Sequence, residues 1–235
     1  MTQSLRALTV SAQVILQALH AAAEGRFPDV DGRVTLLPAL DAPTPDATIN
    51  AVVAFTGHAF VATDADHAAV LAAGADGYGM ASSPPVLTVL SNSSVGQPAI
   101  CGVTDATLFS RGTGRGGTSL TIRHDLERHP RVRHARAIRR DVVVYGDERG
   151  LVTLASGLAG RRELSVEALA EGQGRGWGRS LIADALGLLD DGKVVFAAVA
   201  PGNARSLRAF LGLGFQVIGS ETIIRVAVRA TGVAS

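Results

Sequence analysis

The sequence predicts an α/β fold with a mixed sheet, and three observations lead to this prediction. Residues 139–228 alternate short apolar runs with amphipathic helical patterns, as α/β domains do. A glycine-rich turn at residues 173–178 separates one such run from a helical pattern. The 235 residues are enough for one large domain or two small ones with a real hydrophobic core.

The N-terminal half contains elements of both types. Leu16 and Leu19 recur near helical spacing and Gly25 follows them, which favours a helix that ends there. Asp64 or Asp66 is placed to cap the start of a second helix. We expect helices at residues 12–25, 67–73 and 85–91, strands at 34–37 and 49–62, and loops at 39–47 and 111–118.

From residue 139 the pattern is more regular. A turn sequence at residues 146–150 separates two strands, and the unbroken apolar run at 194–200 is typical of a buried strand. Asn203 caps the next helix, which Gly214 ends. We expect strands at residues 142–145, 151–154, 163–168, 194–200, 215–218 and 223–228, and helices at 177–189 and 203–211.

The composition excludes several classes of protein. No apolar run reaches the roughly 20 residues that span a bilayer, and the N-terminus has no signal-peptide pattern, so we expect a cytoplasmic protein without membrane contact. Cys101 is the single cysteine, which excludes an internal disulfide framework and a cysteine-based zinc site. We expect no metal, because the three evenly spaced histidines lie among arginines that repel a divalent cation: His124, His129 and His134.

The net charge of +1 hides an asymmetry. Residues 111–140, called here the Arg-rich segment, contain nine arginines and two acids, so this segment carries +7 and the rest of the chain −6. We interpret it first as a solvated helix. Its cations could also contact phosphate groups, including those of a coenzyme. Because it lacks the interleaved aromatic residues that stack on bases, nucleic acid is the less favoured partner.

The turn at residues 173–178, Gln-Gly-Arg-Gly-Trp-Gly, is the sharpest motif. Its glycines permit positive φ and let the backbone approach a ligand closely. The unpaired N–H groups and the dipole at a helix start favour an anion, and Arg175 and Arg179 add positive charge. A pyrophosphate fits this chemistry, and a purely structural glycine-rich helix start is the alternative.

With these residues in view, the C-terminal half resembles the GNAT superfamily of N-acetyltransferases. Residues 168–178, Ala-Leu-Ala-Glu-Gly-Gln-Gly-Arg-Gly-Trp-Gly, are similar to its motif A, and residues 203–215, Asn-Ala-Arg-Ser-Leu-Arg-Ala-Phe-Leu-Gly-Leu-Gly-Phe, to its motif B. The two motifs have the family's order and separation. The resemblance implies a GNAT-like acyl-CoA-binding fold at residues 126–235, with residues 1–125 as an N-terminal extension or accessory domain that could supply early elements of the fold.

The resemblance also implies acetyl-CoA, or another acyl-CoA, as co-substrate, whose acyl group passes to a primary amine by direct attack. The pyrophosphate would lie on residues 173–178, and the pantetheine arm beside strand 163–168 where that strand diverges from 194–200. A backbone N–H near residues 166–169 would polarise the thioester carbonyl. The residues implied in coenzyme binding are Ala168, Leu169, Gln173, Gly174, Arg175, Gly176, Trp177, Gly178, Arg179, Asn203, Ser206 and Phe210.

Two carboxylates on strand 163–168 are the candidate catalytic residues. Glu163, Ser165 and Glu167 share one face of this strand. An ammonium substrate must lose a proton before it attacks, and Glu167 or Glu163 could accept that proton directly or through water. The alternative is that these acids pair with neighbouring arginines, namely Arg161, Arg162 or Arg139.

Two positions depart from the family pattern. Many members have Tyr where this chain has Phe210, which cannot protonate the departing thiolate, so that Ser206 or a water would have to substitute. Ala198 stands where some members have a catalytic Glu. A non-catalytic acyl-CoA-binding module is therefore the second hypothesis, and a nucleic-acid-associated protein that uses the Arg-rich segment is the third. We expect a small-molecule or peptide amine as partner, and a homodimer remains open.

Overall fold

The computed structural model describes residues 8–116, 119–172 and 174–228. The helices are α1 (Val10–Ala23), α2 (His67–Ala72), α3 (Pro84–Ser91), α4 (Pro130–Ile138), α5 (Trp177–Gly187) and α6 (Ala204–Leu211), with 3-10 turns η1 (Met80–Ser82), η2 (Leu158–Gly160) and η3 (Ala170–Gly172). The strands are β1 (Arg33–Leu37), β2 (Leu40–Asp41), β3 (Ala47–Phe55), β4 (His58–Ala62), β5 (Ile100–Cys101), β6 (Asp105–Arg111), β7 (Thr121–Ile122), β8 (Arg140–Asp147), β9 (Gly150–Ser156), β10 (Arg162–Ala168), β11 (Val194–Val199) and β12 (Gln216–Ala227).

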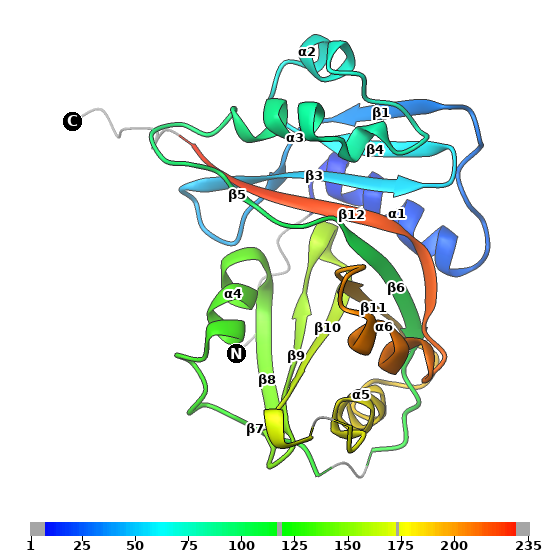
Figure 1. The fold of residues 1–235 in the computed structure, drawn as a ribbon, viewed down its shortest axis with the longest axis vertical. Helices are drawn as coiled ribbons and strands as arrows, with labels where there is room; N and C mark the ends of the chain where they lie inside the picture. Colours follow the sequence, from blue (N-terminus) through cyan, green and yellow to red (C-terminus); the bar gives the residue numbers. More distant parts are fainter. Residues whose placement is uncertain (1–7, 117–118, 173, 229–235) are drawn as a thin grey trace.

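The strands of the described residues form one mixed sheet in the order β1-β4-β3-β12-β6-β11-β10-β9-β8-β7, with β2 beside β3 and β5 beside β12 (Figure 1). The pairs β1–β4 and β10–β11 are parallel, and the other pairs described are antiparallel. The predicted α/β class with a mixed sheet is confirmed. The expected helices are also confirmed, with ends that differ by two residues or fewer.

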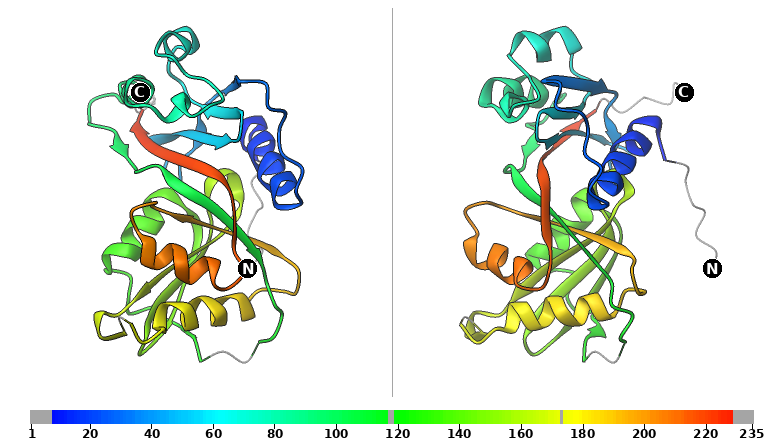
Figure 2. Two further views of the ribbon diagram at one scale, coloured as in Figure 1. Left: turned by 45° about the vertical axis from the view of Figure 1, so that its right-hand side comes forward. Right: turned by 90° about the vertical axis from the view of Figure 1, so that its right-hand side faces the viewer.

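Helices cover both faces of the sheet (Figures 1 and 2). On one face, α1 packs against β3, β4 and Phe196 of β11, and α4 packs on β8 and β9. On the other face, α2 and α3 cover β3, β4 and the end of β12, while α5 and α6 cover β6, β10 and β11. The apolar alternation of each strand explains this arrangement, because successive side chains point to opposite faces. On β11, for example, Val195 and Ala197 face α5 and α6 whereas Phe196 faces α1.

Three of the expected strands are arranged differently in the structure. The strand expected at residues 49–62 is a hairpin, β3 and β4, because Gly57 at φ +78° forms a turn. The two strands expected at 215–218 and 223–228 are the single strand β12, which bends at a β-bulge between Val217 and Gly219. At Gly219 a Cβ would lie 2.3 Å from the Ala54 carbonyl oxygen, so this glycine allows close strand pairing rather than ending the strand.

No sequence pattern indicated β6, which lies in the middle of the sheet between β11 and β12. Six residue pairs join β6 to β11, from Val194↔Arg111 to Val199↔Ala106. On its other side, Asp105 lies opposite Glu221 of β12, and β12 continues to β3. The sheet is therefore continuous across residue 125. The domain boundary placed there stays a prediction.

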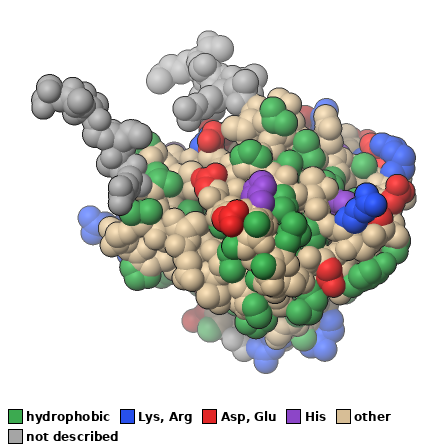
Figure 3. Space-filling view, turned by 90° about the horizontal axis from the view of Figure 1, so that it is seen from above, with side chains coloured by type: hydrophobic (Ala, Val, Ile, Leu, Met, Phe, Trp, Pro, Cys, Tyr) green, Lys and Arg blue, Asp and Glu red, His purple; other side chains and the backbone are tan. Residues whose placement is uncertain are grey.

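The end of the molecule formed by α2, η1 and α3 is the end viewed in Figure 3. The segment from α2 to η1 exposes Leu71, Tyr78 and Met80, and Figure 3 shows apolar side chains dispersed among polar ones on this end. None of the helices in the described part of the chain is long and apolar enough to cross a membrane.

Candidate functional site

The candidate site begins where β10 and β11 diverge. These parallel strands pair at one position, Glu163↔Phe196, and their carboxyl ends separate beyond it. Neighbouring strands hold each one in place, since β10 pairs with β9 along its whole length and β11 pairs with β6. The sheet therefore opens at a fixed place, as expected for strands 163–168 and 194–200.

The glycine-rich turn lies beside this opening, at the start of α5. Gly174 and Gly176 have φ values of +76° and +79°, and Gly176 is the N-cap of α5. A Cβ on either glycine would meet no atom within 4 Å, so glycine is needed here for its backbone conformation and not for space. The first N–H groups of α5 are those that a helix leaves without intrahelical partners, and a helix start of this kind favours an anion.

The helix α6 contributes the opposite wall. Asn203 caps it, because its side-chain oxygen accepts a hydrogen bond of 3.1 Å from the Ser206 N–H. Two pairs of residues one turn apart face the same space, Arg205 and Ser206 in the first turn and Arg208 and Ala209 in the next. The cap predicted at Asn203 is confirmed.

These elements enclose a cavity of about 840 Å³. That volume is within the usual range for small-molecule and cofactor sites. Its charged lining residues are four arginines and one glutamate, so the cavity favours a ligand with several negative charges. It is lined by Arg131, Val166, Glu167, Ala168, Leu169, Gly172, Gly174, Gly176, Trp177, Gly178, Arg179, Ile182, Asn203, Arg205, Ser206, Arg208 and Ala209.

Nine of the twelve residues expected in coenzyme binding lie in this lining, and two described ones, Arg175 and Phe210, do not. Gln173 is outside the described residues. Arg175 is exposed in the turn, where its N–H donates to the Gly172 carbonyl. Phe210 is corrected to a core residue, since it is 3% exposed and packs edge-on against Phe215 with ring centroids 4.8 Å apart.

The lining also contains residues that the sequence motifs did not indicate. Arg205, Arg208 and Ala209 follow from the helical spacing of motif B, which would have identified this face of α6. Arg131 comes from α4, more than thirty residues before β10 in the chain. No local pattern could have placed it here, because only the packing of α4 beside β8 and β9 brings it to the cavity.

The backbone of β10 presents N–H groups to the opening. The Leu169 N–H donates to the Arg149 carbonyl over 2.9 Å, and β10 pairs with β9 without a register shift. Alternate residues of an antiparallel pair bond to the same neighbouring strand, so Glu167 also points its N–H toward β9. Val166 and Ala168 therefore point their N–H groups the other way, toward the gap beside β11. Of the N–H groups expected near residues 166–169 to polarise a thioester carbonyl, only those of Val166 and Ala168 point toward this gap.

Glu163 is corrected from a candidate base to a buried ion-pair residue. It is 1% exposed, and its two oxygens lie 2.5 Å from Arg139 Nη2 and 3.0 Å from Arg161 Nη2. Burial alone would raise the pKa of this carboxyl, but Arg139 and Arg161 outweigh burial and lower it. A carboxylate held charged and away from solvent is a poor proton acceptor. Glu163 is therefore paired with neighbouring arginines, which was the alternative to its role as a base.

Glu167 does line the cavity, at its rim toward α4. Its Oε2 accepts a hydrogen bond of 2.7 Å from Arg131 Nε, and its Oε1 lies 3.8 Å from His129 Nε2. The third polar residue of this face, Ser165, shares a hydrogen bond of 2.7 Å with Thr153. Glu167 can therefore be reached by a ligand, but it is already paired with a cation.

The Arg-rich segment is solvated in part and ion-paired in part. Its helix α4 exposes Arg133 and Arg136 on its outer side. Four of its arginines pair with acids, namely Arg123 with Asp125, Arg131 with Glu167, Arg136 with Glu127 and Arg139 with Glu163. These pairs leave a smaller free positive charge than the sequence count indicates. Among the described residues no group of His, Cys, Asp and Glu side chains is arranged to hold a metal ion.

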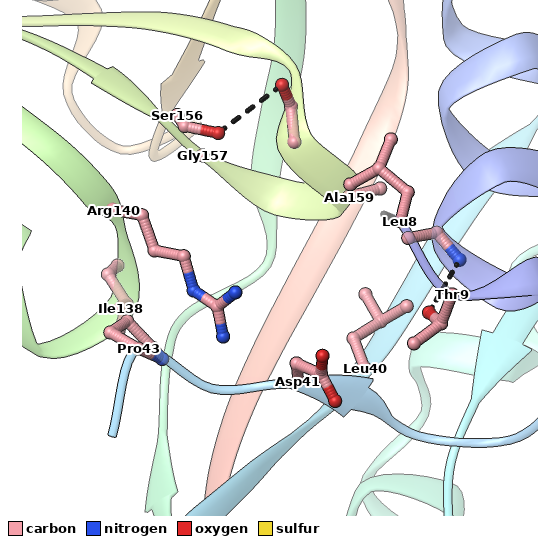
Figure 4. A pocket seen from close by; sticks show the side chains of 12 residues that line it. Leu8, Thr9, Leu40, Asp41, Pro43, Ile138, Arg140, Ser156, Gly157 and Ala159 are labelled. Carbon is pink, nitrogen blue, oxygen red and sulfur yellow. Dashed lines mark hydrogen bonds between the residues drawn. The ribbon is translucent and has the colours of Figure 1, made fainter. Parts of the chain in front are cut away.

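A second, smaller cavity lies between the start of α1 and the ends of β8 and β9 (Figure 4). Its volume is about 80 Å³, which suits a few water molecules and not a coenzyme. Arg140 extends into it toward Asp41 (Figure 4). Its guanidinium donates a hydrogen bond to the Ala42 carbonyl. This cavity lies between the N-terminal elements and β8, and the residues of the glycine turn before α5 are not part of its lining.

Comparisons with known proteins give similarity at the level of solved structures. No family model matches the chain, and no curated protein matches it. A protein assigned to the GNAT family of acetyltransferases from Novosphingobium aromaticivorans is similar with a TM-score of 0.39, at 15% identity, over 57% of this chain and 71% of that chain. A GCN5-related N-acetyltransferase from Kribbella flavida is similar with a TM-score of 0.36, at 12% identity, over 61% of this chain and 64% of that one. Likeness at these scores carries no conclusion about function, which has to come from the site itself.

Proposed function

We propose that the protein is an N-acyltransferase of the GNAT type that uses acyl-CoA, with acetyl-CoA as the expected donor, and acylates a primary amine. The observation that carries this proposal is the arginine-lined cavity between the diverging strands and the glycine turn of α5. The acceptor would be a small-molecule or peptide amine. We expect the reaction to occur in the cytoplasm and to need no metal ion.

The residues of the cavity fit the groups of a coenzyme A ester. The start of α5, with Gly174 and Gly176, would hold the pyrophosphate by its N–H groups and its dipole. Arg179 and Arg208 lie where they would bind the remaining phosphate charge. Asn203 at the start of α6 would approach the pantetheine arm, which would run along β10.

The reaction expected there is direct attack by the amine on the thioester carbonyl. The N–H groups of Val166 and Ala168 point to the gap in which that carbonyl would lie, and they would stabilise its developing negative charge. Phe210 cannot act as an acid toward the departing thiolate. Since a thiol has an ordinary pKa of roughly 8.5, the thiolate can leave near neutral pH without such an acid.

Calorimetric titration of the purified protein with acetyl-CoA tests the binding step. We expect saturable binding in the micromolar range. Arg208→Glu should weaken it at least tenfold, because the substitution reverses a charge in the cavity lining. Arg133→Glu is the matched control, since Arg133 is exposed on α4 and outside the cavity. Absence of saturable binding by the wild type, or equal loss in both variants, would refute the proposal.

A non-catalytic acyl-CoA-binding module is the second candidate. It is favoured by the burial of Phe210 and by the arginine partners of both candidate carboxylates, Glu163 and Glu167. Release of free thiol from acetyl-CoA in the presence of n-butylamine, tyramine, spermidine or a lysine-containing peptide separates the two candidates. The enzyme should release thiol in proportion to at least one amine, whereas the binding module should bind acetyl-CoA and release none.

A further inference from the structure

Asp105 lies beside the end of β11 at which the sheet opens, and no sequence motif indicated it. It is the first residue of β6, and Ala106 beside it pairs with Val199, the last residue of β11. Asp105 is therefore level with the end of β11, where that strand has separated from β10. The sequence motifs could not identify it, because β6 precedes both of them in the chain by more than fifty residues.

The side chain of Asp105 lies on the face of the sheet that also carries Glu163 and Glu167. It lies directly opposite Glu221, and Thr107, two residues along the same strand, donates a hydrogen bond of 2.7 Å to Glu221. Cross-strand neighbours and residues two apart share a face. This is the face opposite α5 and α6, so an acceptor could reach it without crossing the coenzyme cavity.

A fixed ionic network lies next to Asp105. Arg161, fully buried, binds Glu221 through two nitrogens at 2.5 and 2.6 Å and also binds Glu163. Arg139 completes the network on Glu163. Two arginines therefore offset the two buried glutamates, and Asp105 adds a negative charge that they do not neutralise.

Asp105 differs from those glutamates in access and in partners. It is half-buried, whereas Glu163 and Glu221 are 1% and 2% exposed. No described residue donates a hydrogen bond to its carboxylate. Ala198 of β11, which pairs with Thr107 of β6, is also half-buried, so solvent reaches this part of the face. An accessible, unpaired carboxylate at a net negative position attracts a cation.

We propose that Asp105 binds the ammonium group of the acceptor and takes its proton, directly or through one water. This inference rests on the proposed acyltransfer and names its base, in place of Glu163 and Glu167. One proton passes from the ammonium nitrogen to the carboxylate. The nitrogen lone pair then forms the bond to the acyl carbon, the carbon–sulfur bond breaks with its electrons on sulfur, and the second proton of the nitrogen goes to the thiolate through water.

The titration of Asp105 fits this task. Burial, and then the charges of Glu221 and Glu163, raise the pKa of Asp105 to about 6, against the opposing effect of Arg139 and Arg161. A base with a pKa near the working pH is charged and yet able to hold a proton. The charged groups that act on Asp105 are Glu221 from β12, Glu163 from β10, Arg161 before β10 and Arg139 before β8.

The kinetic test measures thiol release from acetyl-CoA between pH 5.5 and 9.5, with the amine of the panel that reacts fastest. For the wild type, kcat/KM should rise to a plateau with a midpoint near pH 6. Asp105→Asn should lower kcat/KM at pH 7 by about 100-fold or more. The kcat/KM of this variant should instead rise about tenfold per pH unit. The reason is that the fraction of unprotonated alkylamine rises tenfold per pH unit below the amine's pKa of roughly 10.4.

Controls separate a base from a structural residue. Asp105→Glu keeps a carboxylate and should retain the midpoint, and Asp41→Asn, which removes an exposed carboxylate from β2, should behave as the wild type. The proposal is overturned if Asp105→Asn keeps half or more of the wild-type kcat/KM at pH 7, or keeps the midpoint near pH 6.

A measurement without turnover gives a second decision. The side-chain carboxyl carbons of ¹³C-labelled aspartates report protonation by NMR, and the Asp105 signal is the one that Asp105→Asn removes. We expect a midpoint near pH 6 that n-butylammonium lowers and n-butanol does not. An ordinary midpoint with no response to the cation contradicts the proposal. Acetyl-CoA binding is measured in the same samples: its absence from the wild type refutes the acyltransfer, whereas intact binding and turnover with a harmless Asp105→Asn refute only the role of Asp105.

Discussion

At the scale of single residues, the glycine turn shows how a backbone conformation creates a binding site. Gly174 and Gly176 both adopt positive φ in open space, so neither is needed for packing. The conformation turns the chain so that the first residues of α5 line the cavity. Any side chain at these positions has to pay a conformational cost to keep them there.

We expect Gly176→Ala to weaken acetyl-CoA binding at least fivefold and to destabilise the fold by about 1 kcal/mol, because alanine disfavours positive φ. Calorimetry and denaturant unfolding measure the two effects. Gly202→Ala is the matched control, since Gly202 also has open space around it but does not adopt positive φ. Equal effects of the two substitutions would show that backbone conformation is not the reason.

The raised pKa of Asp105 predicts that its ionisation destabilises the fold as the pH rises. Because its pKa is raised to about 6 in the fold from 3.8, its contribution to stability is full below pH 3.8 and is lost as the pH rises through about 6. Asp105→Asn, which cannot ionise, should therefore have a higher Tm than the wild type at pH 7.5 and about the same Tm at pH 4. Thermal unfolding at both pH values checks this, with Asp41→Asn as the variant expected to show no such difference.

At the scale of elements, β10 shows how one strand carries two kinds of charged residue. Its alternation places Glu163 and Glu167 on the same face, as the sequence predicts. Their environments differ because Gly157, Arg139 and Arg161 surround Glu163 near the first end of the strand, whereas the second end borders the cavity. Glu163 is therefore structural, and Glu167 is accessible at the rim.

We expect Glu163→Gln to destabilise the fold by about 3–5 kcal/mol at pH 7, because it leaves Arg139 and Arg161 without their shared carboxylate. Glu167→Gln, at a half-exposed pair, should cost about 1 kcal/mol or less. Denaturant unfolding measures both.

The pH dependence of the Glu163 effect has a definite sign. The pKa of this carboxyl is lowered in the fold, so its contribution is present above the unfolded pKa of about 4.5 and is lost as the pH falls through the lower folded value. The gap between the wild type and Glu163→Gln should be constant from pH 6 to 8 and narrow below pH 4.5. A gap that widens in acid would contradict the assignment of the network.

At the scale of the whole molecule, β6 joins the two halves of the chain. It pairs with β11 on one side and β12 on the other, and its Leu108 is fully buried under α5 and α6. The part of the chain with both motifs therefore lacks a central strand of its own sheet. The N-terminal residues supply that strand, together with β3, which covers the far half of β12.

A fragment of residues 126–235 should accordingly fail to fold by itself. Without β6 the edges of β11 and β12 are unpaired, and the core around Leu108 has a gap. We expect a poorly dispersed amide NMR spectrum and no cooperative thermal transition, in contrast to the full chain. A well-dispersed spectrum with cooperative unfolding would instead support an independent domain that begins near residue 126.

The sequence by itself determined the local features: the helices and their caps, the glycine turn, the strand that borders the cavity and the face its carboxylates share. These follow from periodicity, capping and backbone conformation, which act over a few residues. The tertiary structure alone decided that Glu163 is buried between arginines, that Arg131 reaches the cavity, and that Asp105 lies level with the carboxyl end of β11. Each of these depends on strand order and helix packing between distant segments, and pairing partners leave no signal in the local sequence.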